Sequence, residues 1–104
     1  MNADQVRQVV KQYRTYLSLV GDEAKEANFD LPPTRGEATR HLLSMCDQIE
    51  EMLEKVEKLP CISAESEAAW EKANRWLGFM QGVLWAQGSF TLNELKGHNI
   101  LPVL

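Results

Sequence analysis

The sequence predicts an all-α fold, a small helical bundle of three long helices followed by a short C-terminal helix. Three observations predict it. Apolar residues recur at steps of three and four along three long segments, capping residues stand before each helical segment, and no segment alternates with period two for long enough to form a strand. With 104 residues the chain is expected to form a single helical domain, 1–104. The helices are expected near 3–27, 34–59, 64–87 and 92–97.

The first helix is predicted from Asn2 onward, because Gln5 stands three residues later and can return the capping bond. Its apolar stripe comprises Val6, Val9, Val10, Tyr13, Leu17, Val20, Ala24 and Ala27. Gly21 weakens the helix by about 1 kcal/mol relative to Ala, so a break there is an alternative. Pro32 and Pro33 mark the connection that follows.

The later helices carry similar signals. Thr34 and Glu37 form a Thr-x-x-Glu capping box, and Pro60 ends the second helix. Ser63 or Ser66 can cap the third helix, and Gly88 is a plausible stop. A second box, from Thr91 to Glu94, opens the fourth. The expected core is Val6, Val10, Tyr13, Leu17, Leu42, Met45, Ile49, Met52, Val56, Trp76, Met80 and Val83.

Composition excludes several classes of protein. The longest nearly apolar run, 76–86, is about half the roughly 20 residues that span a bilayer, so no membrane segment is expected. A net charge of −4 disfavours a general nucleic-acid binder. The N-terminus lacks the pattern of an export signal. Cys46 and Cys61 are too few for a disulfide framework, and together these features predict a cytoplasmic protein.

The segment from Trp76 to Trp85 is the most unusual part of the chain, because Gln81 is its only polar side chain. Gly78 and Gly82 lie four residues apart on one helical face, which predicts close packing against another helix. The simple interpretation is a buried stripe. The alternative is that Trp76, Phe79 or Trp85 faces outward and binds a partner protein or a second copy, which makes a homodimer possible.

Charged residues form two further stripes. The carboxylates of Glu50, Glu51, Glu54 and Glu57 lie mostly off the apolar stripe of the second helix, either as a solvated face or as a surface for a basic partner. Basic residues form the opposite stripe, on the first helix and the start of the second: Arg7, Lys11, Arg14, Arg35 and Arg40. Pairing with the glutamates of a neighbouring helix is the expected use of the basic stripe, and phosphate contact is the alternative.

Enzyme patterns are weak in this sequence. Two Glu-x-x-Glu pairs, at 23–26 and 51–54, are similar to the Mg²⁺ site of all-α nucleotide pyrophosphatases, but the last Asp of that pattern is Glu here. His41, Cys46, Cys61 and His98 fit no tetrahedral metal pattern, and Cys46 is expected to be buried. No nucleophile has an evident base, and no Gly-rich phosphate loop is present. We therefore expect no catalytic residue, cofactor or metal.

Two blocks of sequence resemble a mostly uncharacterised family of small proteins encoded by lambdoid phages and related prophages. One block is Thr34-Arg-Gly-Glu-Ala38 with Arg40-His-Leu-Leu43. The other runs from Arg75 to Trp85 and continues through Thr91–Lys96 to His98-Asn99. The resemblance implies a phage origin, and no catalytic residue is carried over from it.

The function expected from these features is that of a phage-encoded, non-enzymatic protein in the host cytoplasm. It would bind and modulate a host nucleic-acid-processing or defence enzyme, with inhibition as the expected effect, by way of the aromatic helix, the acidic face and the apolar residues 100–104. The alternatives are a small nucleic-acid-binding accessory factor and a Mg²⁺-dependent nucleotide pyrophosphatase.

Overall fold

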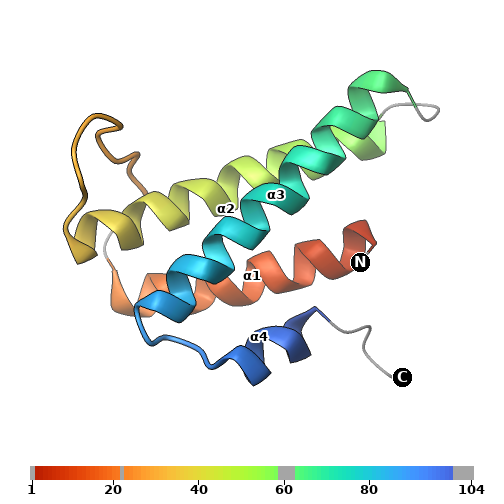
Figure 1. Ribbon diagram of the computed structural model, residues 1–104. Coiled ribbons are helices and arrows are strands. Elements are labelled where there is room, and N and C mark those ends of the chain that lie inside the picture. The colour runs from red at the N-terminus through yellow and green to blue at the C-terminus, as the bar shows by residue number, and fades with distance from the viewer. Residues whose placement is uncertain (1, 22, 59–62, 100–104) are drawn as a thin grey trace.

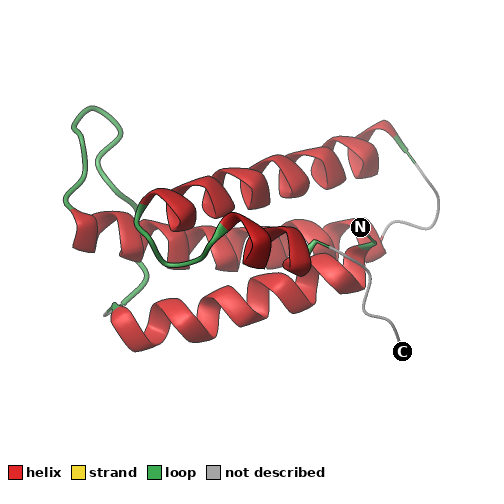
Figure 2. Cartoon of the chain, turned by 60° about the horizontal axis from the view of Figure 1, so that its bottom comes forward, coloured by secondary structure: helices red, strands yellow, loops and turns green. Residues whose placement is uncertain are grey.

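Four helices form one bundle in the computed structural model, which describes residues 2–21, 23–58 and 63–99. They are α1 (Ala3–Val20), α2 (Arg35–Lys58), α3 (Ala64–Ala86) and α4 (Leu92–His98). Helices α2 and α3 form an antiparallel pair, α1 packs along α2, and α4 lies against the underside of the bundle (Figures 1 and 2). The predicted fold class is therefore confirmed, and none of the described helices is long and apolar enough to cross a membrane.

The predicted capping residues hold the helix starts. Asn2 and Gln5 exchange hydrogen bonds of 2.8 and 2.9 Å between side chain and backbone. Ser63 is the cap of α3, with Ser66 returning the bond. Thr34 with Glu37 and Thr91 with Glu94 make the same reciprocal pattern before α2 and α4. Each box satisfies backbone N–H groups that a helix start would otherwise leave without a partner.

The first helix ends at Val20 and not at residue 27, so the alternative of a break at Gly21 is confirmed. Gly21 lies so close to α2 that a Cβ added to it would stand 2.7 Å from Cγ2 of Thr39. Beyond it the backbone bonds to α2: the N–H of Lys25 donates to the carbonyl of Arg40, and that of Ala27 donates to Nδ1 of His41. Part of the connection is thus hydrogen-bonded to α2, which the spacing of Ala24 and Ala27 did not indicate.

The core is wider than the single stripes predicted. Most of the expected residues are buried, whereas Met52, Val56, Trp76 and Val83 are only half-buried, and all of these but Val56 pack against the edge of the core. Further buried residues fill the middle: Val9, Leu43, Cys46, Leu53, Ala73, Leu77, Leu84 and Leu95. Helix α2 contacts both α1 and α3, so its buried face is broader than one stripe.

The turn after α3 directs the chain into α4. Gly88 has φ +74°, in the left-handed region, and the N–H of Ser89 donates to the carbonyl of Leu84 at 2.8 Å. This is a Schellman ending, in which glycine avoids the steric cost of a Cβ. The predicted stop at Gly88 is confirmed, and the turn brings Phe90 back over α1.

Candidate functional site

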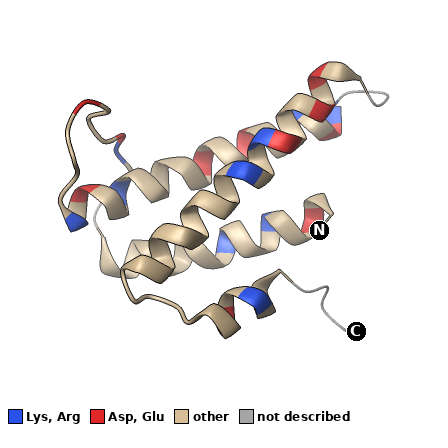
Figure 3. Cartoon of the chain, viewed as in Figure 1, with Lys and Arg blue, Asp and Glu red and all other residues tan. Residues whose placement is uncertain are grey.

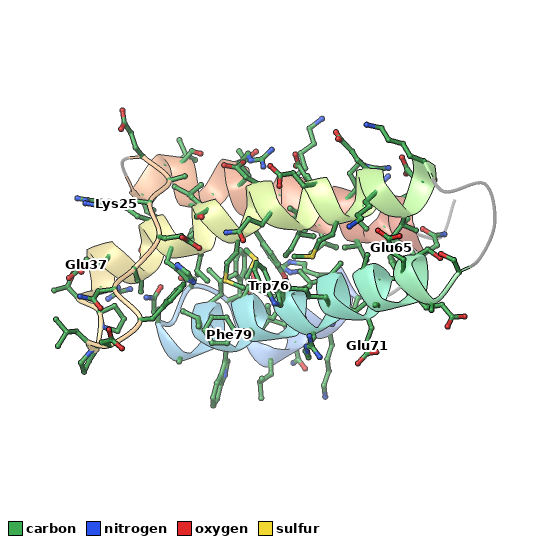
Figure 4. The ribbon with its side chains drawn as sticks, turned by 90° about the horizontal axis from the view of Figure 1, so that it is seen from above. Lys25, Glu37, Glu65, Glu71, Trp76 and Phe79 are labelled. Carbon is green, nitrogen blue, oxygen red and sulfur yellow. The ribbon has the colours of Figure 1, made fainter. Side chains whose placement is uncertain are left out.

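The outward face of α3 carries two large aromatic side chains. Phe79 is 57 % exposed and Trp85 is 52 % exposed. At about 100° per residue, Gly82 lies roughly 60° around the helix from each of them, so a bare strip of backbone separates the two rings. In Figure 4, Glu71 and Phe79 are on the side of α3 that faces away from α2, whereas Trp76 lies between the two helices.

Trp76 belongs to a different environment from the other two aromatic candidates. Its ring is half-buried and packs against the core, and the ammonium of Lys72 lies 5.0 Å from the ring centroid. A cation at this distance is attracted by the negative face of the indole. Of the three aromatic candidates, Phe79 and Trp85 are therefore exposed, while Trp76 packs against the bundle.

The two helical glycines lie on the exposed face of α3. Of the described residues, none would come within 4 Å of a Cβ built on Gly78 or Gly82. The close approach predicted for another helix of the same chain is therefore not found in the part that the structure describes. Their spacing is explained neither by packing within the bundle nor by a positive φ.

An open hollow adjoins Trp85 at the end of α3. It is lined by the turn that follows the helix and by the start of α4, and its apolar members are Trp85, Phe90 and Leu92. Leu92 is 54 % exposed. Trp85 and Leu92 thus share an exposed apolar surface at this hollow, and Phe79 is not among its lining residues. Residues 100–104, which were also expected to contribute, lie outside the described residues.

The acidic face of α2 is partly neutralised by α1. Arg7 donates to Glu57 at 2.6 Å, and Arg14 donates to Glu50 at 2.7 Å and also to Asp47. Charged residues of both signs therefore meet along this seam (Figure 3). The expected pairing of the basic stripe with glutamates is confirmed for Arg7 and Arg14.

The remaining charged candidates are divided between several places. Glu51 and Glu54 are exposed on α2, apart from the seam. Arg35 donates to the backbone carbonyl of Gln87 at 2.9 Å, which ties the start of α2 to the end of α3. Arg40 lines a polar hollow beside Lys25 and Glu37. The five cations proposed for phosphate contact are therefore not arranged as one continuous free stripe.

The structure does not assemble the metal and nucleophile candidates into one site. Glu23 and Glu26 lie in the connection after α1, and no group of three or more His, Cys, Asp or Glu side chains among the described residues could hold a metal ion. Cys46 is buried as expected, and burial raises the pKa of its thiol to about 12. A thiol with this pKa is a poor nucleophile at neutral pH. Cys61 lies outside the described residues.

A polar and aromatic cluster joins α1, α3 and α4, and sequence analysis missed it. The hydroxyl of Tyr13 lies 2.7 Å from Nδ1 of His98 and accepts a 3.0 Å hydrogen bond from Gln81. Gln81 also exchanges bonds with Asn99 at 2.8 and 3.2 Å. Phe90 packs against the rings of Tyr13 and His98. Burial raises the pKa of Tyr13, opposed by the bond from Gln81.

This cluster holds α4 in place. In the sequence it was indicated only by Gln81, the single polar residue inside the apolar segment from Trp76 to Trp85. Buried polar atoms need partners, which here come from α1 and α4.

Comparison of the chain with protein-family models, with curated proteins and with solved structures gave no match.

Proposed function

We propose that this chain is a non-enzymatic, phage-encoded protein that binds and inhibits a host enzyme of nucleic-acid processing or defence in the bacterial cytoplasm. The observation that carries the proposal is the exposure of Phe79 and Trp85 on one side of a capped helix. Leu92 adds apolar surface beside Trp85 at the neighbouring hollow. Aromatic side chains of this kind are enriched among the residues that dominate binding energy at protein interfaces.

Rigidity supports the same proposal. α3 is capped at its start by Ser63 and closed at its end by Gly88, so its surface is ordered before a partner arrives. A preorganised surface loses less conformational entropy on binding. Phe79 and Trp85 then offer large apolar area at the cost of few rotatable bonds.

The charge of the chain and its resemblance to phage proteins support the choice of partner. A net charge of −4, with Glu51 and Glu54 exposed on α2, favours encounter with a basic protein surface. Enzymes that handle nucleic acid carry such surfaces. The two sequence blocks similar to lambdoid phage proteins are the reason for placing that enzyme in a bacterial host.

The test is affinity capture from bacterial lysate with a tagged chain, followed by an activity assay of the captured enzyme. F79D places a charge in the aromatic surface. L19D is the matched control, because Leu19 is an apolar residue 82 % exposed on α1. We expect a stoichiometric host protein with the wild type and with L19D, its loss with F79D, and inhibition of its activity by the wild type.

A second pair of variants tests the acidic contribution. E51K and E54K reverse charges that lie outside the contact between α2 and α1. Reversal of Glu50 or Glu57 would also break their hydrogen bonds to Arg14 and Arg7. We expect slower association and a weaker salt dependence in the first pair. Circular dichroism confirms folding of each variant. The proposal is wrong if the folded wild type captures no host protein. It is also wrong if F79D captures the same protein as the wild type.

A further inference from the structure

The outer face of α3 carries six exposed residues at the spacing of a helix–helix seam. They follow one another at steps of four and three, which is the repeat that keeps one face of a helix toward a partner helix. All six are exposed in the structure. The seam consists of Ala64, Ala68, Glu71, Arg75, Gly78 and Gly82.

The order of residues along the seam is complementary to the same order read backwards. Read from the start it is small, small, acidic, basic, small, small, so a second α3 running in the opposite direction meets it with complementary chemistry at every position. The opposed pairs are Ala64 with Gly82, Ala68 with Gly78 and Glu71 with Arg75. A parallel arrangement would instead set each charge against its own kind, at a cost in free energy. Charge complementarity therefore selects the antiparallel pair.

The glycines supply an independent argument. A glycine inside a helix is less favourable than alanine by about 1 kcal/mol. Nothing among the described residues within 4 Å of the missing Cβ atoms of Gly78 and Gly82 offsets that loss. Glycine and alanine do allow two helix backbones to approach to the short end of the usual 8–10 Å range of interaxial distances. A close partner helix would account for both residues.

We propose that a second copy of this chain docks on the outer face of α3, with the two α3 helices antiparallel and related by a twofold axis near residue 73. Glu71 of each copy then faces Arg75 of the other. In the isolated chain these two residues make an exposed pair of 3.6 Å along their own helix, which contributes little alone. A twofold axis makes the contact self-complementary and closed, so it yields a dimer and not a filament.

Phe79 lies beside the seam and is not part of it. It stands about 60° around the helix from Gly82, at the rim of the proposed dimer, where it remains available to a host protein. Trp85 and Leu92 lie past the last seam residue. The dimer goes beyond the proposed function and does not rest on it, because it is decided by residues 64–82 of α3 alone.

The decisive experiment is a charge swap read by sedimentation equilibrium. We expect the wild type to associate to twice the 11.8 kDa of one chain at micromolar concentration. E71R sets like charges together at two symmetric places and is expected to raise the dissociation constant at least tenfold, and R75E is expected to do the same. The double variant E71R/R75E restores both pairs and is expected to return to within about threefold of the wild type.

A glycine variant tests the close approach. G78Q/G82Q puts long side chains in the seam while replacing glycine by a better helix former, so we expect a monomer of undiminished helicity. G36Q is the matched control, because Gly36 is also an exposed helical glycine, and a Cβ built on it has none of the described residues within 4 Å. It is expected to leave the dimer intact.

The inference is overturned if the wild type stays at 11.8 kDa up to several hundred micromolar, or if E71R/R75E associates no better than either single variant. Failure of the host-protein capture would leave this result untouched, since no lysate protein enters the measurement. A dimer that survives G78Q/G82Q would place the contact elsewhere and refute the proposed seam.

Discussion

Substitution of Gly82 by alanine is expected to stabilise the folded chain. The added methyl group meets none of the described residues within 4 Å, so it introduces no clash. Alanine is favoured over glycine in a helix interior by about 0.8–1.0 kcal/mol, mainly because glycine loses more backbone freedom on folding. Since the site is exposed, almost no burial term is added, and the expected gain is about 1 kcal/mol.

The assay is urea unfolding followed by circular dichroism, at a chain concentration below that at which sedimentation shows association. A gain of about 1 kcal/mol moves the midpoint upward with no change in slope. In a thermal melt it corresponds to roughly 4–8 °C for a domain of this size. G21A is the contrasting control: its Cβ would stand 2.7 Å from Thr39, whose hydroxyl is bonded to the carbonyl of Arg35, so a loss is expected. A loss of stability in G82A would refute the view that this face is uncovered in the monomer.

Three further outcomes are expected. G88A forces a Cβ onto a residue at φ +74° and should cost about 1 kcal/mol in the same urea assay, whereas no change would mean that the turn relaxes. Y13F removes the hydroxyl bonded to Gln81 and to His98, and should cost about 1 kcal/mol and speed amide exchange in α4; unaltered exchange would contradict its holding role. Hydrogen bonds from Thr34 and Thr91 lower the pKa values of Glu37 and Glu94 from 4.5. The two ionised carboxylates therefore stabilise the folded chain fully above that pH, and this stabilisation is lost as the pH falls through the lowered pKa values. The double variant E37Q/E94Q should show a flatter decline of stability in acid, and an equally steep decline would assign it to other groups.

The helix starts could be predicted because capping is local. Thr34 with Glu37 and Thr91 with Glu94 lie three residues apart, so the sequence contains both partners of each bond. For the end of α1 the sequence offered the break at Gly21 only as an alternative, and it could not decide between that break and a helix to residue 27. The observed end depends on how closely Gly21 approaches Thr39 and on hydrogen bonds from the connection to α2, which are contacts between distant parts of the chain.

The candidate site was predictable as a segment but not as a surface. α3 is apolar on both sides near its end, so periodicity alone could not separate buried Leu77, Met80 and Leu84 from exposed Phe79 and Trp85. The choice depends on the side from which the other helices approach. The role of Gln81 was hidden for the same reason, because its partners stand 68 and 18 positions away.

The contact between Tyr13 and His98 joins positions 85 residues apart, which has a consequence for how the chain matures during synthesis. Helices α1, α2 and α3 can pack first, with Gln81 of α3 already bonded to the hydroxyl of Tyr13. The contact of Tyr13 with His98 and the cover that Phe90 gives to α1 form only when α4 docks. Contacts of such long range are slow to form because a large loop must close first. Until α4 docks, a newly made chain would therefore expose aromatic side chains of α1 to solvent, where a chaperone or protease can bind them.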